Sequence, residues 1–107
     1  MSASILIVDD EEAIRTSLRS ILEDEGYEVA IAANGLEALK IYGTDPPDLM
    51  ILDIWMPEMD GLETLRRVKE FVPTTQVMMI SGHGSIETAV KAIKLGAYDY
   101  IEKPLSL

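Results

Sequence analysis

Short apolar runs alternate with segments of helical period along this 107-residue chain, and that alternation limits the possible folds more than any other feature. Residues 4–8, 49–52 and 76–80 are apolar almost throughout, which is typical of strands buried on both faces of a parallel sheet. Residues 27–32 alternate more, as expected at the edge of a sheet, and residues 98–101 provide a fifth strand. The pattern therefore predicts five strands.

Amphipathic segments fill the gaps between these strands. The first predicted helix begins near Ala13 and stops at Gly26, a residue type that commonly follows the last turn of a helix. Arg15 and Arg19 fall on the face opposite its apolar stripe. Three more helices are predicted: residues 35–42, stopped by Gly43; residues 61–72, entered through Asp60 and Gly61 and closed by Pro73; and a helix from Ile86, stopped by Gly96.

Strands that alternate with helices indicate an α/β fold with right-handed crossovers. We predict one domain over residues 1–107, a doubly wound five-stranded parallel sheet of the flavodoxin-like type with strand order 2-1-3-4-5. The chain reaches Leu107 where a fifth helix would begin. We therefore expect the last helix to be missing, which would leave apolar surface exposed on the sheet and the first helix and favour dimerisation.

The charge balance excludes several classes of function. Nineteen acidic residues face nine basic ones, for a net charge of −10, so the chain is not expected to bind nucleic acid by itself. It has no cysteine, which excludes disulfides, thiolate metal sites and a cysteine nucleophile. No apolar run could cross a bilayer. We expect a soluble, intracellular, cytoplasmic domain.

Five polar residues follow the predicted strands, at the end where open parallel sheets bind their ligands. Asp9 and Asp10 follow the first strand, Asp53 the third, Ser81 the fourth and Lys103 the fifth. Two carboxylates ~4 Å apart repel by about 4 kcal/mol at an effective dielectric constant of ~20. One lysine cannot offset three acids, so the site must bind either protons or a divalent cation.

Oxygen ligands without histidine or cysteine favour Mg²⁺. The residues thus predict a Mg²⁺-dependent phosphoryl site with an aspartate as candidate nucleophile. The simpler alternative is helix capping, which Asp10 or Glu11 could provide for the first helix. Capping does not explain acids and a lysine on three separate strand ends.

Over its whole length the chain resembles the receiver domain of two-component response regulators. The resemblance rests on an ordered set of motifs: Val8 to Glu11, Asp53 to Pro57 with Asp60-Gly61, Ser81-Gly82, and Lys103-Pro104.

The resemblance implies a role for each of these positions. Asp53 would accept a phosphoryl group from a sensor histidine kinase, and Lys103 would pair first with Asp53 and then with the phosphate. Ser81 would bind another phosphate oxygen, and Tyr100 would turn inward as the switch aromatic. Asp9, Asp10, Asp53 and the backbone carbonyl of Trp55 would hold Mg²⁺, and the bond between Lys103 and Pro104 would be cis.

Within the family, the segments Ser81 to Gly84 and Leu95 to Pro104 resemble receivers of sigma-54-dependent transcriptional activators of the nitrogen-regulator type. That likeness implies a longer natural protein with an ATPase module and a DNA-binding module. It also implies a readout surface on the fourth helix and fifth strand, around residues 85–100.

Three alternatives compete with this interpretation. A receiver-like module that only binds proteins would show no phosphoryl transfer. A Mg²⁺-dependent aspartate phosphohydrolase normally has an acid two residues after its nucleophile, where this chain has Trp55, which cannot transfer a proton. Flavin mononucleotide binding is disfavoured because the loop at residues 9–12 is acidic where a phosphate would need hydrogen-bond donors.

Overall fold

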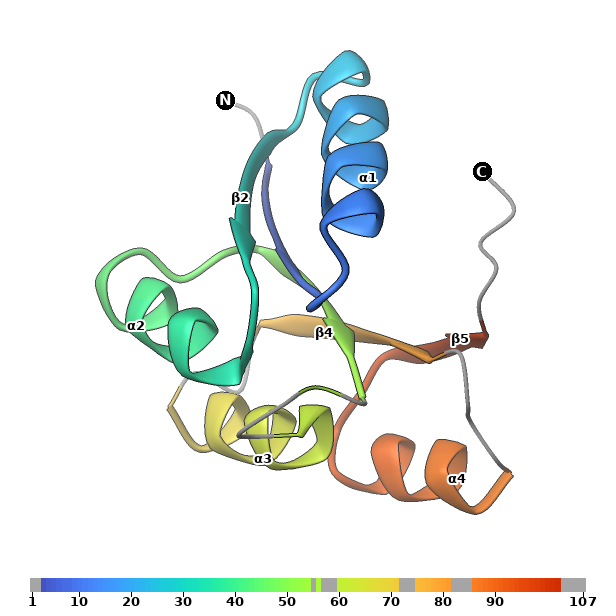
Figure 1. Ribbon diagram of the computed structural model, residues 1–107. Helices are drawn as coiled ribbons and strands as arrows, with labels where there is room; N and C mark the ends of the chain where they lie inside the picture. The colour runs from blue at the N-terminus through green and yellow to red at the C-terminus, as the bar shows by residue number, and fades with distance from the viewer. Residues whose placement is uncertain (1–2, 55, 57–59, 72–74, 82–85, 103–107) are drawn as a thin grey trace.

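A computed structural model describes residues 3–54, 56, 60–71, 75–81 and 86–102. Strands and helices alternate through these residues as predicted, and all five strands are parallel (Figure 1). The elements in chain order are β1 (Ser4–Val8), α1 (Glu12–Asp24), β2 (Glu28–Ala32), α2 (Gly35–Thr44), β3 (Leu49–Asp53), α3 (Gly61–Phe71), β4 (Gln76–Ser81), α4 (Ile86–Lys94) and β5 (Asp99–Glu102).

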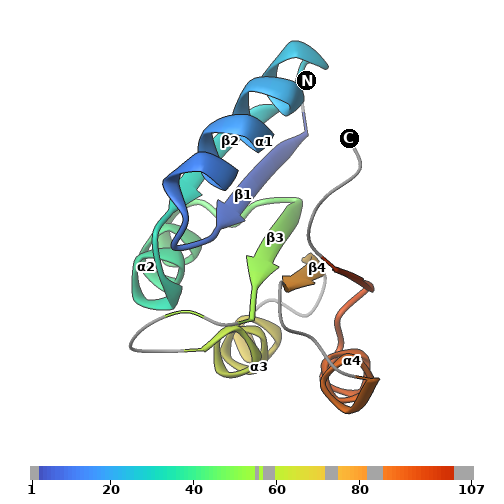
Figure 2. The ribbon, with the colours of Figure 1, turned by 45° about the vertical axis from the view of Figure 1, so that its right-hand side comes forward.

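The sheet has the order β2-β1-β3-β4-β5, which confirms the predicted flavodoxin-like topology and the position of β2 at an edge. Four helices cover its two faces, with α1 on one side and α2, α3 and α4 on the other (Figures 1 and 2). The side chains of each strand alternate between these faces. The fold is therefore a three-layer α/β structure, with the carboxyl ends of all strands at one edge of the sheet.

Each face of the sheet has its own apolar core. The larger core lies under α2, α3 and α4 and includes Leu6, Leu52 and Met79, all fully buried. The smaller core lies under α1, where Leu18 packs with Ile7 and neighbouring strand residues. A strand buried on both sides needs apolar residues at every position, which is why β1, β3 and β4 read as continuous apolar runs.

The face under α1 is only partly covered, as expected. Ile80 is buried there, but Ile101 on β5 and Ile21 on α1 remain 37% and 41% exposed. The predicted absence of a fifth helix concerns residues 103–107, which lie outside the described residues. None of the helices in the described ranges combines the length and the apolar character needed to span a bilayer.

Several element boundaries differ from the prediction. Gly43 does not stop α2, which continues to Thr44, and the Thr44 hydroxyl donates to the carbonyl of Ile41. The fifth strand begins at Asp99 rather than Tyr98, although the Tyr98 amide already donates to the carbonyl of Val77 on β4 at 2.7 Å.

The two glycines predicted to end helices do so. Gly26 and Gly96 have φ angles of 93° and 109°, in the left-handed region that other residues rarely adopt. The amide of each one bonds back to the last turn of the preceding helix.

A buried polar chain closes the amino-terminal edge of the sheet, opposite the predicted site. The Tyr42 hydroxyl donates to the Thr75 hydroxyl at 2.7 Å, and Thr75 donates to the carbonyl of Pro47 at 3.3 Å. These bonds connect α2 to the segments that lead into β3 and β4. They stabilise the packing of α2 without contacting the site at the other end of the strands.

Candidate phosphoacceptor site

Register in the sheet brings the predicted acids together. Val8 pairs with Leu52 on the neighbouring strand, so Asp9 and Asp53 follow at the same level. The sequence predicts that Asp53 and Ser81 directly follow their strands. In the structure Asp53 is instead the last residue of β3, and Ser81 is the last residue of β4. Ladder bonds therefore reach the acid itself, which fixes its backbone more firmly than a loop would.

Asp9, Asp10 and Asp53 form a compact group of carboxylates. One oxygen from each lies within 4.8 Å of the other two. Asp9 and Asp53 are buried, whereas Asp10 is exposed. Charges at this separation repel by about 3–4 kcal/mol per pair at an effective dielectric constant of ~20. The all-oxygen donor set and the concentrated negative charge fit a hard divalent cation.

The turn after β1 is ordered by Asp9 rather than by a capping acid. The amide of Glu11 donates to the Asp9 carboxylate at 2.9 Å. Glu11 occupies the N-cap position of α1, but its side chain makes no capping bond within the described residues. The capping alternative for Glu11 is therefore wrong. Asp9 orders the turn, and Asp10 is the exposed member of the group.

Arg15 was placed by sequence pattern on the outer face of α1, yet it reaches the site. Its Nη1 donates to the backbone carbonyl of Asp9 at 2.7 Å. The side chain is half-buried, while Arg19 one turn further along pairs with Glu23 on the surface. The available signal was spacing, since a residue six positions after Asp9 lies in the first turns of the helix that follows.

Gly61 is the second residue whose role at the site the sequence pattern did not reveal. Its amide donates to the carbonyl of Ile54 at 2.7 Å, directly after Asp53. A Cβ atom at Gly61 would lie only 2.1 Å from the backbone oxygen of Asp53. Only glycine lets the start of α3 approach the end of β3 this closely.

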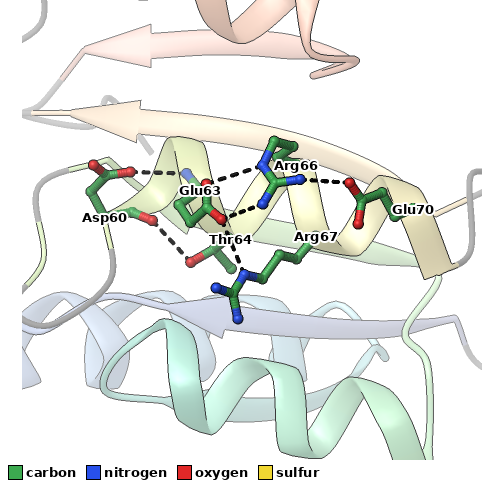
Figure 3. A network of polar contacts seen from close by, with 6 residues as sticks. All are labelled: Asp60, Glu63, Thr64, Arg66, Arg67 and Glu70. Atoms are coloured by element: carbon green, nitrogen blue, oxygen red, sulfur yellow. Dashed lines mark hydrogen bonds and ion pairs between the residues drawn. The ribbon is translucent and has the colours of Figure 1, made fainter.

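A polar network fixes the first turns of α3 next to this contact (Figure 3). The Asp60 side chain accepts the amide of Glu63 at 2.9 Å, as an N-cap residue does. Hydrogen bonds from Arg66 and then Arg67 lower the pKa of Glu63 to about 2. The charges lie on the exposed side of the helix, so they order α3 without entering the acidic group.

Of the other predicted site residues, Ser81 and Tyr100 lie in the part of the chain that the structure describes. Ser81 is fully buried at the end of β4. Tyr100 pairs in register with Met79 and packs on the larger core, on the sheet face that Ser81 shares. Its hydroxyl oxygen is buried and has no hydrogen-bond partner among the described residues. Trp55, Lys103 and Pro104 lie outside the described residues.

Comparison with known proteins agrees with this geometry. The family model of the response regulator receiver domain matches residues 5–107. An NtrX-like response regulator from Rickettsia bellii is 56% identical over 104 residues, which cover 95% of this chain and 22% of that protein. The nitrogen assimilation regulatory protein NtrX of Azorhizobium caulinodans is 51% identical, with 99% and 24% covered. This chain thus spans less than a quarter of these relatives.

Solved structures show the same fold. The crystal structure of NtrX from Brucella abortus superposes with a TM-score of 0.92 at 49% identity and covers 99% of this chain and 24% of that one. The beryllofluoride-activated NtrC4 receiver domain dimer gives 0.91 at 48% identity, with 96% and 85% covered. With this fold, this group of acids and these relatives, the chain belongs to the response regulator receiver domain family, a family of signalling phosphoacceptors.

Proposed function

We propose that Asp53 accepts a phosphoryl group from a sensor histidine kinase in a Mg²⁺-dependent reaction and that the domain then switches an output. The observation that carries the proposal is the approach of three carboxylate oxygens, from Asp9, Asp10 and Asp53, to within 4.8 Å of one another. Family membership favours this function over the phosphohydrolase and flavin alternatives.

The metal site would comprise the carboxylates of Asp9, Asp10 and Asp53 and the backbone carbonyl of Trp55. Bound Mg²⁺ would supply positive charge that offsets the carboxylates and the incoming phosphoryl oxygens. Because Asp10 is exposed and the other two acids are buried, the cation would enter from the side of Asp10. Mg²⁺ keeps several waters in such sites, which leaves positions for phosphoryl oxygens.

In the transfer itself, a carboxylate oxygen of Asp53 attacks the phosphorus atom of the donor. A new O–P bond forms as the bond from phosphorus to the donor nitrogen breaks, and the donor histidine keeps that electron pair and takes up a proton. The product is an aspartyl phosphate. Burial of Asp53 at the end of a paired strand holds its carboxylate in place, so little reorganisation is needed for attack.

The output would depend on a two-state element that the new charge favours. Ser81 and Lys103 would reach phosphate oxygens, and Tyr100 would follow Ser81 on the same sheet face. Moving an equilibrium from 1:99 to 99:1 takes about 5.5 kcal/mol, a large demand for so few contacts. We therefore expect the active state to be partly populated before phosphorylation.

We further propose that the natural protein is longer, as its relatives are. An ATPase module and a DNA-binding module would follow this domain and control transcription in the bacterial cytoplasm. The receiver itself would contact the kinase and other protein modules, with homodimerisation as one output, and would not bind nucleic acid directly.

The test is the intact mass of the protein after incubation with acetyl phosphate, with and without Mg²⁺. Wild type is expected to gain one phosphoryl group only when Mg²⁺ is present, and Asp53→Asn is expected to gain none. Asp24→Asn, which removes the same charge from the far end of α1, should behave as wild type. A folded wild type that gains nothing would instead indicate a module that only binds proteins.

A further inference from the structure

Arg15 makes a contact unlike those of the other arginines described. Arg19, Arg66 and Arg67 each pair with a glutamate on their own helix. Glu11 and Glu12 lie one turn before Arg15, at the N-cap and the first position of α1, but Arg15 forms no ion pair within the described residues. Its guanidinium donates instead to a neutral backbone carbonyl, that of Asp9, at 2.7 Å.

This contact completes a three-point attachment of Asp9. The amide of Asp9 donates to the carbonyl of Ala32 on β2 at 3.2 Å. Its carboxylate accepts the amide of Glu11 at 2.9 Å, and its carbonyl accepts Arg15. The amide, one carboxylate oxygen and the carbonyl of Asp9 are thereby held by three different elements: the edge strand, the turn and the first helix.

The carbonyl of Asp9 belongs to the peptide that leads into Asp10. A hydrogen bond from a charged donor is roughly twice as strong as one between neutral groups. Fixing this peptide plane fixes the direction in which Asp10 leaves the strand, and with it the separation between the Asp9 and Asp10 carboxylates. The exposed Asp10 has no burial to hold it in place.

We propose that Arg15 is a positioning residue for the metal site: its guanidinium holds the Asp9–Asp10 peptide so that both carboxylates point into one site. This inference rests on the proposed Mg²⁺ function of that site. Arg15 touches neither the metal nor the phosphoryl group. It acts only through the turn after β1.

The sign of its effect on Mg²⁺ separates positioning from plain charge. Arg15 is a cation near a cation site, so its charge alone disfavours Mg²⁺, and removing it should tighten binding. A positioning role predicts the opposite, because loss of the contact lets the peptide rotate and spreads the ligands. Groups that hold metal ligands in place typically contribute about 10- to 100-fold to metal affinity.

The experiment measures the dissociation constant of Mg²⁺ through the fluorescence of Trp55, the only tryptophan in the chain and two residues after Asp53. Arg15→Gln is expected to weaken Mg²⁺ binding by about tenfold. Arg19→Gln is the matched control, since it removes the same charge from the same helix, and it should leave binding unchanged or slightly tighter. Circular dichroism establishes that each variant is folded at the temperature used.

Two further measurements test the positioning role of Arg15. In the metal-free protein, Arg15→Gln should speed hydrogen exchange of the Glu11 amide relative to Arg19→Gln. Arg15→Lys keeps the charge and a donor without the planar fork, so Mg²⁺ should bind about threefold more weakly than to wild type. If Arg15→Gln is unfolded, Arg15→Lys decides alone, and wild-type affinity in it overturns the proposal.

The outcomes distinguish this inference from the proposed function. If wild type binds Mg²⁺ and Arg15→Gln binds it equally or more tightly, the positioning role is wrong and the phosphoacceptor function stands. If wild type neither binds Mg²⁺ nor accepts a phosphoryl group, the proposed function fails, and the positioning role fails with it.

Discussion

Replacing Gly61 by alanine is expected to destabilise the domain and disturb the acidic group, because the site leaves no room for a methyl group. The added Cβ would lie 2.1 Å from the Asp53 oxygen, 2.7 Å from the Ile54 Cα and 2.9 Å from the Asp53 carbonyl carbon. All three are backbone atoms, so no side chain can rotate away. The start of α3 and the end of β3 must instead separate by about 1 Å.

Overpacking of this kind typically costs about 1–3 kcal/mol. For a domain of this size the melting temperature should fall by about 5–15 °C. The matched control is Gly43→Ala, the same change within α2 at a position where a Cβ meets nothing within 4 Å. Alanine is the better helix former, so Gly43→Ala should be neutral or stabilising by up to about 1 kcal/mol.

Thermal melts followed by circular dichroism measure both changes, and the rate of phosphorylation by acetyl phosphate reports the site. Gly61→Ala should be phosphorylated more slowly than wild type at a temperature where both are folded, because the shift moves the Asp53 backbone. The reasoning is refuted if Gly61→Ala melts at or above the wild-type temperature, or if the two glycine variants change stability in the same direction.

Three smaller perturbations test other parts of the structure. Tyr42→Phe removes a buried hydroxyl from Thr75 and should cost about 1 kcal/mol in urea denaturation, with phosphorylation unchanged because the chain lies at the far edge of the sheet. Tyr100→Phe removes a hydroxyl that is buried without a partner in the described part of the chain, so it should raise stability by about 1 kcal/mol, and a loss would show that the hydroxyl is bonded. Hydrogen bonds from Arg66 and then Arg67 lower the pKa of Glu63 from 4.5 to about 2, so their stabilising effect is full above pH 4.5 and disappears as the pH falls to 2. Acid titration of Glu63→Gln should therefore show less loss of stability than wild type in that window, and a small difference overall, since the pair is exposed.

The sequence was sufficient to predict the elements and their order because each signal is local. Apolar runs identified strands buried on both faces, and glycines in the left-handed region at positions 26 and 96 ended two helices. Parallel connectivity then placed all strand ends, and hence Asp9 and Asp53, at one edge of the sheet. The acidic group could be predicted from that topology without any knowledge of side-chain contacts.

What the sequence could not predict depends on contacts between segments distant along the chain or on competition between local signals. Gly43 resembles a helix stop, yet the Thr44 hydroxyl and the backbone extend α2 past it. Helical period placed Arg15 facing solvent, since it does not reveal that a strand-end carbonyl lies within reach. The steric role of Gly61 likewise depends on how closely α3 approaches β3.

The most direct test of the central claim compares two constants in the wild-type protein. One is the Mg²⁺ concentration that gives half the maximal rate of phosphorylation by acetyl phosphate, and the other is the dissociation constant of Mg²⁺ from Trp55 fluorescence at low donor concentration. If the acids at Asp9, Asp10 and Asp53 hold the Mg²⁺ that transfer requires, the two constants agree and both increase in Asp10→Asn. Phosphorylation that proceeds at full rate without Mg²⁺, or that saturates at a concentration unrelated to binding, would contradict the account.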